Sequence, residues 1–179
     1  MKWKNYDNGP GYYYITGTLT EWLPLLARED IRRAVYYEIN LALRRYNASL
    51  AAFVVMPTHL HLLVCLPEAG LLHGFCKCWR GRSARHIIDM LVRQGDQRTL
   101  EVMARHANGG CKYAAWKEQP RVLPTVSKTV LRIKIDYIHA NPVRSRLVAE
   151  LGDWPHSSWV WYENGQAVAL PITPPEELI

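Results

Sequence analysis

The chain has 179 residues, which fits one domain, and its 22 Lys and Arg against 16 Asp and Glu give a net charge of +6 at pH 7. Its four cysteines form neither a C-x-x-C pair nor a zinc-ribbon spacing, which argues against a disulfide scaffold or a zinc ribbon. We find no apolar N-terminal leader and no run of the ~20 apolar residues that span a bilayer, so we expect a cytoplasmic protein that makes no membrane contact.

The charge is distributed unevenly along the chain. Residues 1–150 hold all 22 Lys and Arg and 12 acids, a net charge of +10, whereas residues 151–179 hold four acids and no Lys or Arg, a net charge of −4. A basic body favours a polyanionic partner, of which nucleic acid is the commonest. The same charge would also serve simply to keep the protein in solution, so charge alone leaves both interpretations open.

Several segments have the composition or periodicity of regular elements. Runs of β-branched and aromatic residues indicate strands, and apolar residues at helical spacing indicate helices. In chain order we predict a strand at 12–20, a helix at 29–46, two strands within 50–67, and helices at 71–93 and 128–140. This order predicts an α+β fold in which helices cover an antiparallel sheet.

Single residues define the faces and ends of these elements. We expect Arg32, Arg33 and Glu38 to point outward from the first helix, away from its apolar stripe. A tight turn at Pro57-Thr58 should join the two paired strands, because proline cannot donate a ladder hydrogen bond. The last helix should end before Pro142, because the residue before a proline is driven out of the α region.

Two segments lack a clear periodicity. Glycines and prolines interrupt residues 94–127, so we expect loops and short pieces there, with a strand near Lys112–Trp116. After Asp153, tryptophans should anchor part of the chain, while the last prolines should mark a frayed end. We therefore predict a domain over residues 1–162 and an acidic, proline-rich tail over residues 163–179.

His59-Leu60-His61 is the sharpest local motif. Side chains alternate between the faces of a strand, so Leu60 and every second residue after it form an apolar core face, and both histidines point the other way. The two imidazoles then stand about 6.5 Å apart and can converge on one metal ion. An H-x-H also arises by chance, with both rings merely hydrogen-bonded, so the motif alone leaves a structural role open.

A second group of polar residues lies on the last predicted helix. At 100° per residue, Lys134, Tyr137 and Asn141 share one side of it. The adjacent apolar stripe, which should seat the helix on the sheet, consists of Leu131, Ile135 and Ile138. Spacing alone is equally compatible with an amphipathic tyrosine, an asparagine at a helix end and a solvated lysine.

Four motifs occur in an order that resembles the REP-associated tyrosine transposases, which belong to the single-tyrosine, IS200-like branch of the HUH endonucleases. They are PTHLHLLV at 57–64, WRGRSAR at 79–85, DYIHANPVRSRLV at 136–148 and DWPHSS at 153–158. The H-x-H strand followed by Y-[IL]-x-x-N-P-V is the specific part of this pattern. The resemblance covers roughly residues 12–162, most of the chain.

This resemblance implies a fold and a chemistry. It implies a ferredoxin-like or RRM-like sheet with the H-x-H on a central strand, and one HUH single-tyrosine transposase domain over residues 1–162. It also implies that His59 and His61 bind Mg²⁺ or Mn²⁺ with Asn141 as the third ligand, and that Tyr137 is the nucleophile. The implied substrate is single-stranded DNA beside an imperfect, REP-like hairpin, cut to leave a 5′-phosphotyrosine and a free 3′-hydroxyl.

Basic side chains are the candidates for binding the DNA backbone, which would make the affinity depend on salt. They are Lys77, Arg80, Arg82, Arg85, Lys134 and Arg144. Aromatic residues of the first strand, Tyr12, Tyr13 and Tyr14, are candidates for stacking on unpaired bases, although packing on the sheet is the commoner role for any one of them. We find no nucleotide-binding motif and expect no nucleotide cofactor, because a phosphotyrosine link conserves the energy needed for rejoining.

The chain departs from the family pattern at two places. Arg146 stands where the family usually has a glycine, which would suit a helix C-terminus, so the local backbone should differ or the added charge should contact DNA. The segment WKEQPRVLP, residues 116–124, is shorter than the family's aromatic and basic run there, which puts recognition of the DNA flank by this segment in doubt.

Other readings remain open at this point. A domesticated DNA-binding protein of the same fold would have lost transposition, and an RRM-like RNA-binding module would need exposed aromatics on the sheet. A zinc-dependent hydrolase would need a carboxylate near the histidines, for which Glu68 is the nearest candidate in sequence.

Both a monomer and a homodimer are compatible with the sequence. The charge contrast suggests that residues 163–179 partly cover the DNA cleft.

Overall fold

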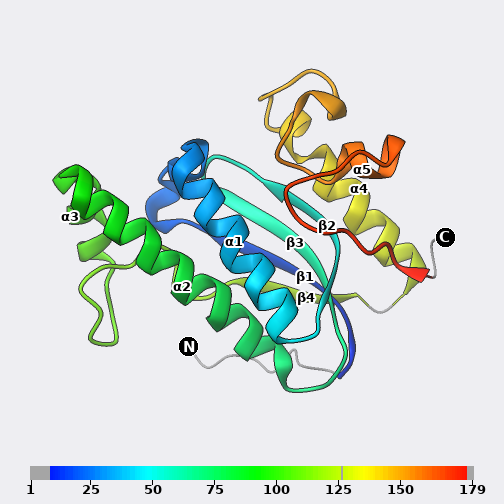
Figure 1. Cartoon of the computed structure of the whole chain (residues 1–179), viewed down its shortest axis with the longest axis horizontal. Coiled ribbons are helices and arrows are strands. Elements are labelled where there is room, and N and C mark those ends of the chain that lie inside the picture. Colours follow the sequence, from blue (N-terminus) through cyan, green and yellow to red (C-terminus); the bar gives the residue numbers. More distant parts are fainter. Residues whose placement is uncertain (1–8, 126, 177–179) are drawn as a thin grey trace.

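The computed structural model describes residues 9–125 and 127–176, within which helices cover both faces of a four-stranded sheet (Figure 1). The strands are β1 (Gly11–Thr18), β2 (Ser49–Val55), β3 (His59–Leu66) and β4 (Arg121–Thr125). The helices are α1 (Glu29–Arg45), α2 (Leu71–Gln94), α3 (Gln97–Arg105), α4 (Lys128–Arg144) and α5 (Trp159–Asn164), with short 3-10 turns η1 (Thr20–Trp22), η2 (Leu25–Ala27) and η3 (Leu151–Asp153). The predicted α+β class is confirmed.

The sheet has the order β2-β3-β1-β4, and every neighbouring pair of strands is antiparallel. β2 and β3 form the predicted hairpin, whose turn contains Pro57-Thr58. Because β3 is an inner strand, its register against β1 fixes what surrounds the two histidines. His59 lies opposite Thr18, and His61 lies opposite Thr16.

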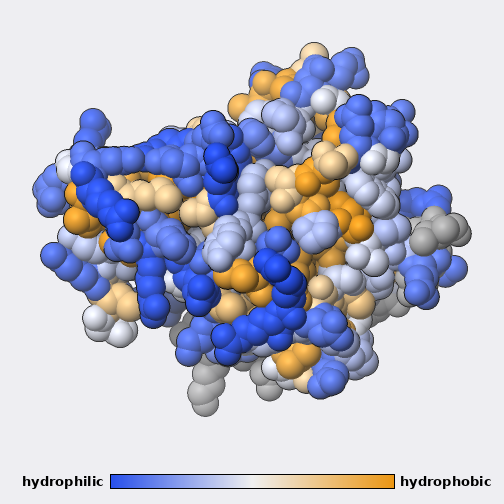
Figure 2. Space-filling view, in the orientation of Figure 1, coloured by the Kyte–Doolittle hydropathy of each residue, from blue (hydrophilic) through white to orange (hydrophobic). Residues whose placement is uncertain are grey.

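Alternation along β3 divides the core into two layers, as predicted. One face of the strand is buried beneath α1 and α2, which lie side by side (Figure 1) and are mostly hydrophilic on their outer surface (Figure 2). Its side chains are Leu60, Leu62, Val64 and Leu66. Leu63, on the histidine face, packs instead with the α4 stripe of Leu131, Ile135 and Ile138. α4 therefore covers the same face of the sheet as His59 and His61.

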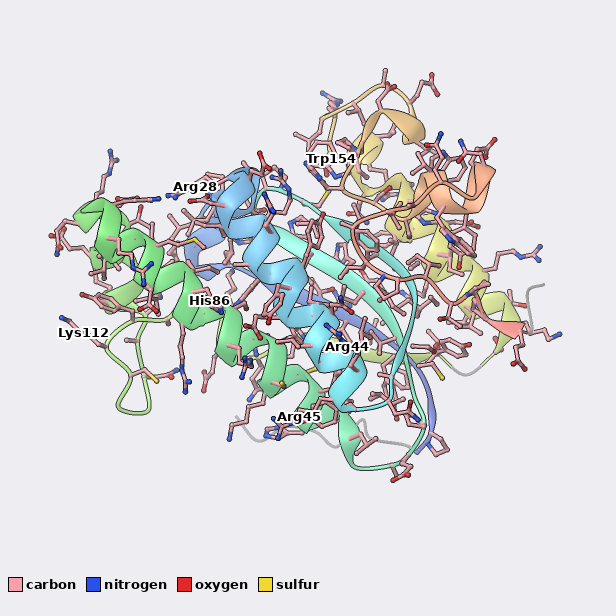
Figure 3. The ribbon with its side chains drawn as sticks, in the orientation of Figure 1. Arg28, Arg44, Arg45, His86, Lys112 and Trp154 are labelled. Atoms are coloured by element: carbon pink, nitrogen blue, oxygen red, sulfur yellow. The ribbon has the colours of Figure 1, made fainter. Side chains whose placement is uncertain are left out.

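The prediction that Glu38 faces outward is wrong. Its side chain is fully buried, with Oε2 accepting a hydrogen bond from Arg82 Nε at 2.5 Å and Oε1 lying 2.9 Å from His86 Nε2. Both partners belong to α2, where His86 is labelled in Figure 3. A buried carboxylate is tolerated when it is paired and hydrogen-bonded, so this cluster joins α1 to α2.

The prediction for residues 94–127 is right about short pieces and wrong about where the strand lies. Residues 97–105 form α3, which Asp96 caps by accepting a hydrogen bond from Thr99 N, and residues 121–125 form β4 at the sheet edge. An edge strand tolerates Pro124. The strand expected near Lys112–Trp116 is absent from the described residues; Trp116 makes one isolated bridge to Leu19.

α4 continues past the position where proline was expected to end it. Pro142 lies in its last turn, where the missing N–H removes one helical bond, and the helix ends at Arg144. Beyond it, Arg146 N donates to Val143 O and Leu147 N donates to Pro142 O, both at 2.9 Å. This is the hydrogen-bond pattern of a Schellman motif, with Arg146 at the left-handed position at φ 56°. Arg146 thus keeps the backbone conformation that a glycine would favour.

Replacing Arg146 with glycine is expected to stabilise the fold. A side chain in the left-handed region costs about 1–2 kcal/mol, and the greater freedom of glycine in the unfolded chain offsets part of that gain. We therefore expect Arg146→Gly to raise the free energy of unfolding by about 0.5–1 kcal/mol, measured by urea denaturation. The matched control is Ser145→Gly, because Ser145 has an ordinary φ of −86°. A destabilised Arg146→Gly variant would show that the side chain makes a compensating contact.

The DWPHSS segment borders β2 and α4. Val55 N donates to His156 O, Ser158 N donates to Phe53 O, and Trp154 Nε1 donates to Val55 O (Trp154 is labelled in Figure 3). Ser158 Oγ also lies 2.8 Å from His139 Nε2 of α4, which is buried. The motif therefore supports the outer edge of β2 and the inner side of α4.

The predicted tail is exposed over residues 163–167 but packs through Val168, Leu170 and Ile172, so the expectation of a frayed end is wrong for the prolines that follow Leu170, as far as residue 176. Leu170 is 1% exposed and belongs to the main core, and Thr173 N donates to Leu50 O at 2.9 Å. Glu177 and the last two residues lie outside the described part of the chain. Across residues 9–125 and 127–176, no helix has the length and apolar character required to cross a membrane.

Candidate active site

The two histidines of β3 project from the sheet face that α4 covers. Their ring centroids are 5.0 Å apart, closer than strand spacing alone predicts. His61 is buried, at 5% exposure, and His59 is half-buried at the beginning of the strand. The two imidazoles therefore converge, and the outer one can be reached from solvent.

Hydroxyl groups engage the Nδ1 atom of each ring. His61 Nδ1 lies 2.7 Å from Tyr14 Oη and 2.9 Å from Thr16 Oγ1, both on β1. His59 Nδ1 lies 3.0 Å from Thr58 Oγ1. When Nδ1–H donates to such an oxygen, it fixes the orientation of a histidine that binds a metal through its other ring nitrogen. In that tautomer, Nε2 is the atom that each ring can offer to a ligand.

Both histidines are neutral at pH 7. Burial lowers the pKa of His59. Burial first, and then the nearby His59 and Lys134, lower the pKa of His61 to about 3, although the amide of Asn141 raises it. Neutral imidazole is the form that coordinates a metal.

α4 places a tyrosine and an asparagine against these rings. Tyr137 is 38% exposed, and its ring centroid lies 5.8 Å from that of His61 and 6.1 Å from that of Tyr14. Asn141, one turn further on, is buried, and its Nδ2 donates to Tyr137 O at 2.8 Å. Because the amide nitrogen is used in this bond, the oxygen of the Asn141 side chain is the atom available to a ligand.

Two cations flank Tyr137 on the same helix. Lys134 Nζ lies 4.7 Å from the ring centroid of Tyr14 and 5.9 Å from that of Tyr137, and Arg144 Cζ lies 5.6 Å from the Tyr137 ring. Both can contact an anion bound in front of the tyrosine. The structure thus brings together the predicted residues His59, His61, Lys134, Tyr137, Asn141 and Arg144.

The four basic candidates of α2 are not part of this group, because α2 covers the opposite face of the sheet. Arg82 pairs with Glu38, and the guanidinium of Arg80 donates to the backbone oxygens of Lys117 and Glu118. Lys77 and Arg85 are exposed. A role in DNA binding stays a prediction for all four and would place DNA on a second face of the molecule.

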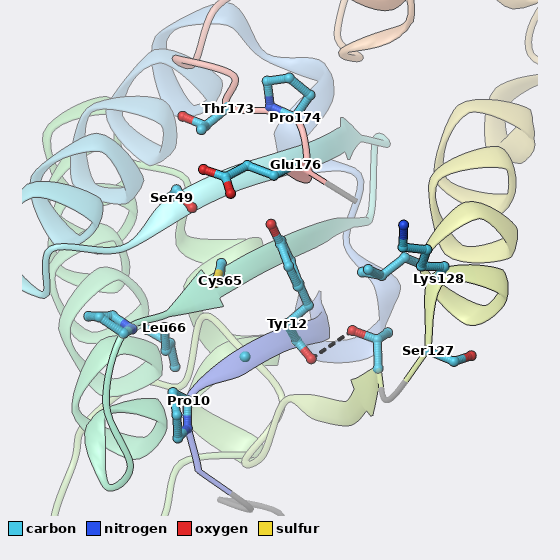
Figure 4. A pocket seen from close by; sticks show the side chains of 14 residues that line it. Pro10, Tyr12, Ser49, Cys65, Leu66, Ser127, Lys128, Thr173, Pro174 and Glu176 are labelled. Atoms are coloured by element: carbon cyan, nitrogen blue, oxygen red, sulfur yellow. Dashed lines mark hydrogen bonds between the residues drawn. The ribbon is translucent and has the colours of Figure 1, made fainter. Parts of the chain in front are cut away.

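Tyr13 and Tyr14, predicted as candidates for base stacking, are buried at 2% and 4% exposure. Tyr12 is half-buried and lines a cavity of about 750 Å³ at the other end of the histidine face, beside Cys65, Lys128 and Glu176 (Figure 4).

The sequence reading missed Tyr14 and Thr16 as partners of His61, because that pairing depends on the register between β1 and β3. It also missed Trp22, whose ring centroid lies 5.5 Å from that of His59.

The candidate site contains neutral donors rather than a cluster of acids. Among the residues that the structure describes, no three His, Cys, Asp or Glu side chains come together in a way that could hold a metal ion. Glu68, the carboxylate that a zinc hydrolase would need, lies beyond the opposite end of β3 from His59. A divalent ion at this site would therefore rest on two imidazoles and one amide oxygen.

Comparison with known proteins supports the fold. No family model and no curated protein matches the sequence. The chain resembles the structure of a REP-associated tyrosine transposase bound to a REP hairpin, with a TM-score of 0.61 and 20% identity, over 99% of this chain and 96% of that chain. A candidate transposase from Deinococcus radiodurans R1 aligns with a TM-score of 0.46 and 20% identity, over 77% of this chain and 95% of that chain. The chain thus has the fold of a REP-associated tyrosine transposase.

Proposed function

We propose that this protein is a single-stranded DNA transposase that recognises a REP-like hairpin and cleaves the adjacent strand through Tyr137. The observation that carries the proposal is the position of Tyr137 on α4, directly over His61 on the same face of the sheet, with Asn141 one turn away. The likeness in fold to a transposase whose structure contains a REP hairpin supports the same conclusion.

His59, His61 and Asn141 are the residues that would hold a divalent ion, for which we propose Mg²⁺ or Mn²⁺. The donors fit such an ion because the imidazoles are neutral and the amide carries no charge, so none of the ion's positive charge is cancelled. The bound ion would polarise the scissile phosphate and hold its orientation. Hydroxyl contacts from Tyr14, Thr16 and Thr58 would keep the two rings in place.

The proposed reaction exchanges one phosphodiester bond for another. The phenolic oxygen of Tyr137 bonds to phosphorus as it loses its proton, the bond from phosphorus to the 3′ oxygen of the preceding nucleotide breaks, and that oxygen gains a proton. The products are a 5′-phosphotyrosine and a free 3′-hydroxyl. Attack by a 3′-hydroxyl reverses the step and joins strands without a nucleotide cofactor, and Lys134 and Arg144 can stabilise the negative charge that develops.

The structure favours this function over two of the other readings. An RRM-like RNA-binding module displays aromatic residues on an open sheet face, whereas here α4 covers that face and Tyr14 is buried beneath it. A zinc hydrolase would need a carboxylate base near the histidines, and Glu68, the nearest candidate in sequence, lies beyond the opposite end of β3 from His59. A DNA-binding protein of the same fold that no longer cleaves differs from the proposal only in activity.

Covalent capture tests the proposed function. The protein is incubated with single-stranded hairpin DNA carrying single-stranded flanks, in Mg²⁺ or Mn²⁺, and then resolved on a denaturing gel. A band that resists denaturation and contains both protein and DNA supports cleavage through a protein nucleophile. Hairpin binding without such a band, over a panel of hairpins and both metals, would favour the protein that binds without cleaving.

We also propose that the acids of the C-terminal segment weaken DNA binding. Glu176 borders the cavity on the histidine face together with Lys128 (Figure 4). Deleting residues 163–179 is a poor test, because it removes the core residue Leu170, whose burial stabilises the fold by about 2 kcal/mol. Replacing Glu163 and Glu176 with glutamine should instead tighten binding of single-stranded DNA at low salt, with the difference fading at high salt. Equal affinities of variant and parent across a salt series would contradict the proposal.

A further inference from the structure

Trp22 is an exposed aromatic residue in direct contact with the candidate site. It is 53% exposed, and its ring meets that of His59 at an interplanar angle of 80°, with centroids 5.5 Å apart. Trp79 and Trp116, by contrast, are 0% and 5% exposed. Binding residues are often found on loops beside a rigid scaffold, and the exposed indole next to His59 is accessible to a ligand.

The backbone is held in an uncommon conformation to present this ring. Glu21 and Trp22 both lie in the left-handed region, at φ 48° and 55°. Two consecutive non-glycine residues of this kind persist only where their surroundings enforce them, and such strain concentrates at functional sites. Thr20 provides the anchor, since its N and Oγ1 donate to the carbonyl oxygens of Ala115 and Ala114 at 3.0 and 2.6 Å.

The side chain of Lys117 lies against the ring of Trp22. Lys117 Nζ lies 4.7 Å from the centroid of Trp22, and Lys117 N donates to Thr18 O at 2.9 Å, so that its backbone is attached to the end of β1. On the other side of the turn, His106 Nε2 lies 3.3 Å from Glu21 Oε1. A polar cavity of about 360 Å³ lies beside this turn and is lined in part by Thr20, Glu21, His106 and Lys117.

We propose that Trp22 and Lys117 form a stacking subsite for one unpaired nucleobase next to the phosphate that is cut. The base would stack on the indole while the ammonium group of Lys117 contacts the phosphate of the same nucleotide. Every base has a π face, so the subsite discriminates weakly between bases and serves to hold the strand across His59. This inference rests on the proposed function, because it presumes that a single strand passes the histidines.

Direct binding measurements test the subsite. The probe is a DNA hairpin with an oligothymidylate flank, and all proteins carry Tyr137→Phe so that the strand stays intact. Trp22→Ala should weaken binding of this probe by roughly 5- to 150-fold, and Trp22→Tyr, which retains an aromatic face, should restore most of it. Binding of the same hairpin without a flank should stay unchanged. Tyr37→Ala is the matched control, because Tyr37 is an equally exposed aromatic residue, at 57%, on α1.

Abasic positions in the flank locate the stacked base. Moving one abasic site along the oligothymidylate should reveal a position where the parent loses affinity and the Trp22→Ala variant does not, because the deleted base and the deleted ring are partners. Equal losses for both proteins at every position would refute the subsite, as would unchanged binding by a Trp22→Ala variant with the parental melting temperature.

The outcomes separate this inference from the proposed function. If the protein with Tyr137 intact forms the covalent adduct but Trp22→Ala has no effect on flank binding, the subsite is wrong and the function stands. If Trp22→Ala weakens flank binding and the abasic pattern appears while no adduct forms with any probe, the subsite stands and the proposed cleavage fails.

Discussion

Tyr137→Phe is expected to abolish the covalent protein–DNA adduct while leaving hairpin binding unchanged. The substitution removes one oxygen from a ring that is 38% exposed, so the packing of α4 on the sheet should hardly change. Loss of a nucleophile typically lowers turnover by several orders of magnitude. The measurements are adduct formation on a denaturing gel and the dissociation constant for hairpin DNA, each compared with the parent.

Tyr14 provides the matched control, because it is the tyrosine packed against both His61 and Tyr137. Its hydroxyl is 2.7 Å from His61 Nδ1, and burial raises its pKa, which keeps it protonated and a poor nucleophile. Tyr14→Phe should therefore still form the adduct, more slowly because His61 loses an orienting contact. Mass spectrometry of the trypsin-digested adduct should place the nucleotide on the peptide from Ile135 to Arg144. A nucleotide on Tyr113, on Tyr162 or on a serine would falsify the assignment.

Local sequence patterns, namely strand alternation and helical spacing, predicted which residues of the candidate site share a face. The alternation of His59, Leu60 and His61 fixes which side chains share a face, and the helical spacing of Tyr137 and Asn141 fixes their common side, because both depend on local backbone geometry. The resemblance to a transposase family added what spacing left open, namely that the helix and the strand face each other. The structure agrees, since Leu63 of β3 and Ile138 of α4 share one apolar cluster.

Features that depend on distant partners were not predictable. The burial of Glu38 requires Arg82 and His86, more than forty residues away on another helix, and helical periodicity says nothing of such pairs. β4 was obscured by Pro124, which is compatible with a strand only at a sheet edge. Glu21 and Trp22 adopt left-handed backbone conformations although neither is a glycine or asparagine, so the sequence does not predict this turn. Hydrogen bonds from the surrounding loop hold it in place.

Loss of the proposed metal-binding histidines is also expected to have a large effect on cleavage. Replacing both His59 and His61 with alanine, or adding EDTA to the parent, is expected to abolish cleavage, because the scissile phosphate would lose its polarising ion. His59→Ala is the better single substitution, since His59 is half-buried, whereas removing the buried His61 leaves the hydroxyls of Tyr14 and Thr16 without their partner. We expect His59→Ala to keep the parental melting temperature within a few degrees and to lose cleavage.

Metal binding supplies a readout that is independent of activity. Isothermal titration with Mn²⁺ should give one site in the parent and none in the double variant, and Asn141→Ala should weaken that site. His73→Ala, which alters an exposed histidine on α2 at the opposite face of the sheet, should bind Mn²⁺ as the parent does. Imidazole ligands also accept zinc and nickel, so these ions should compete for the site, whereas Mg²⁺ or Mn²⁺ should support cleavage. Cleavage that survives the double substitution or persists in EDTA would show that Tyr137 acts without a metal, and the roles proposed for His59, His61 and Asn141 would then be wrong.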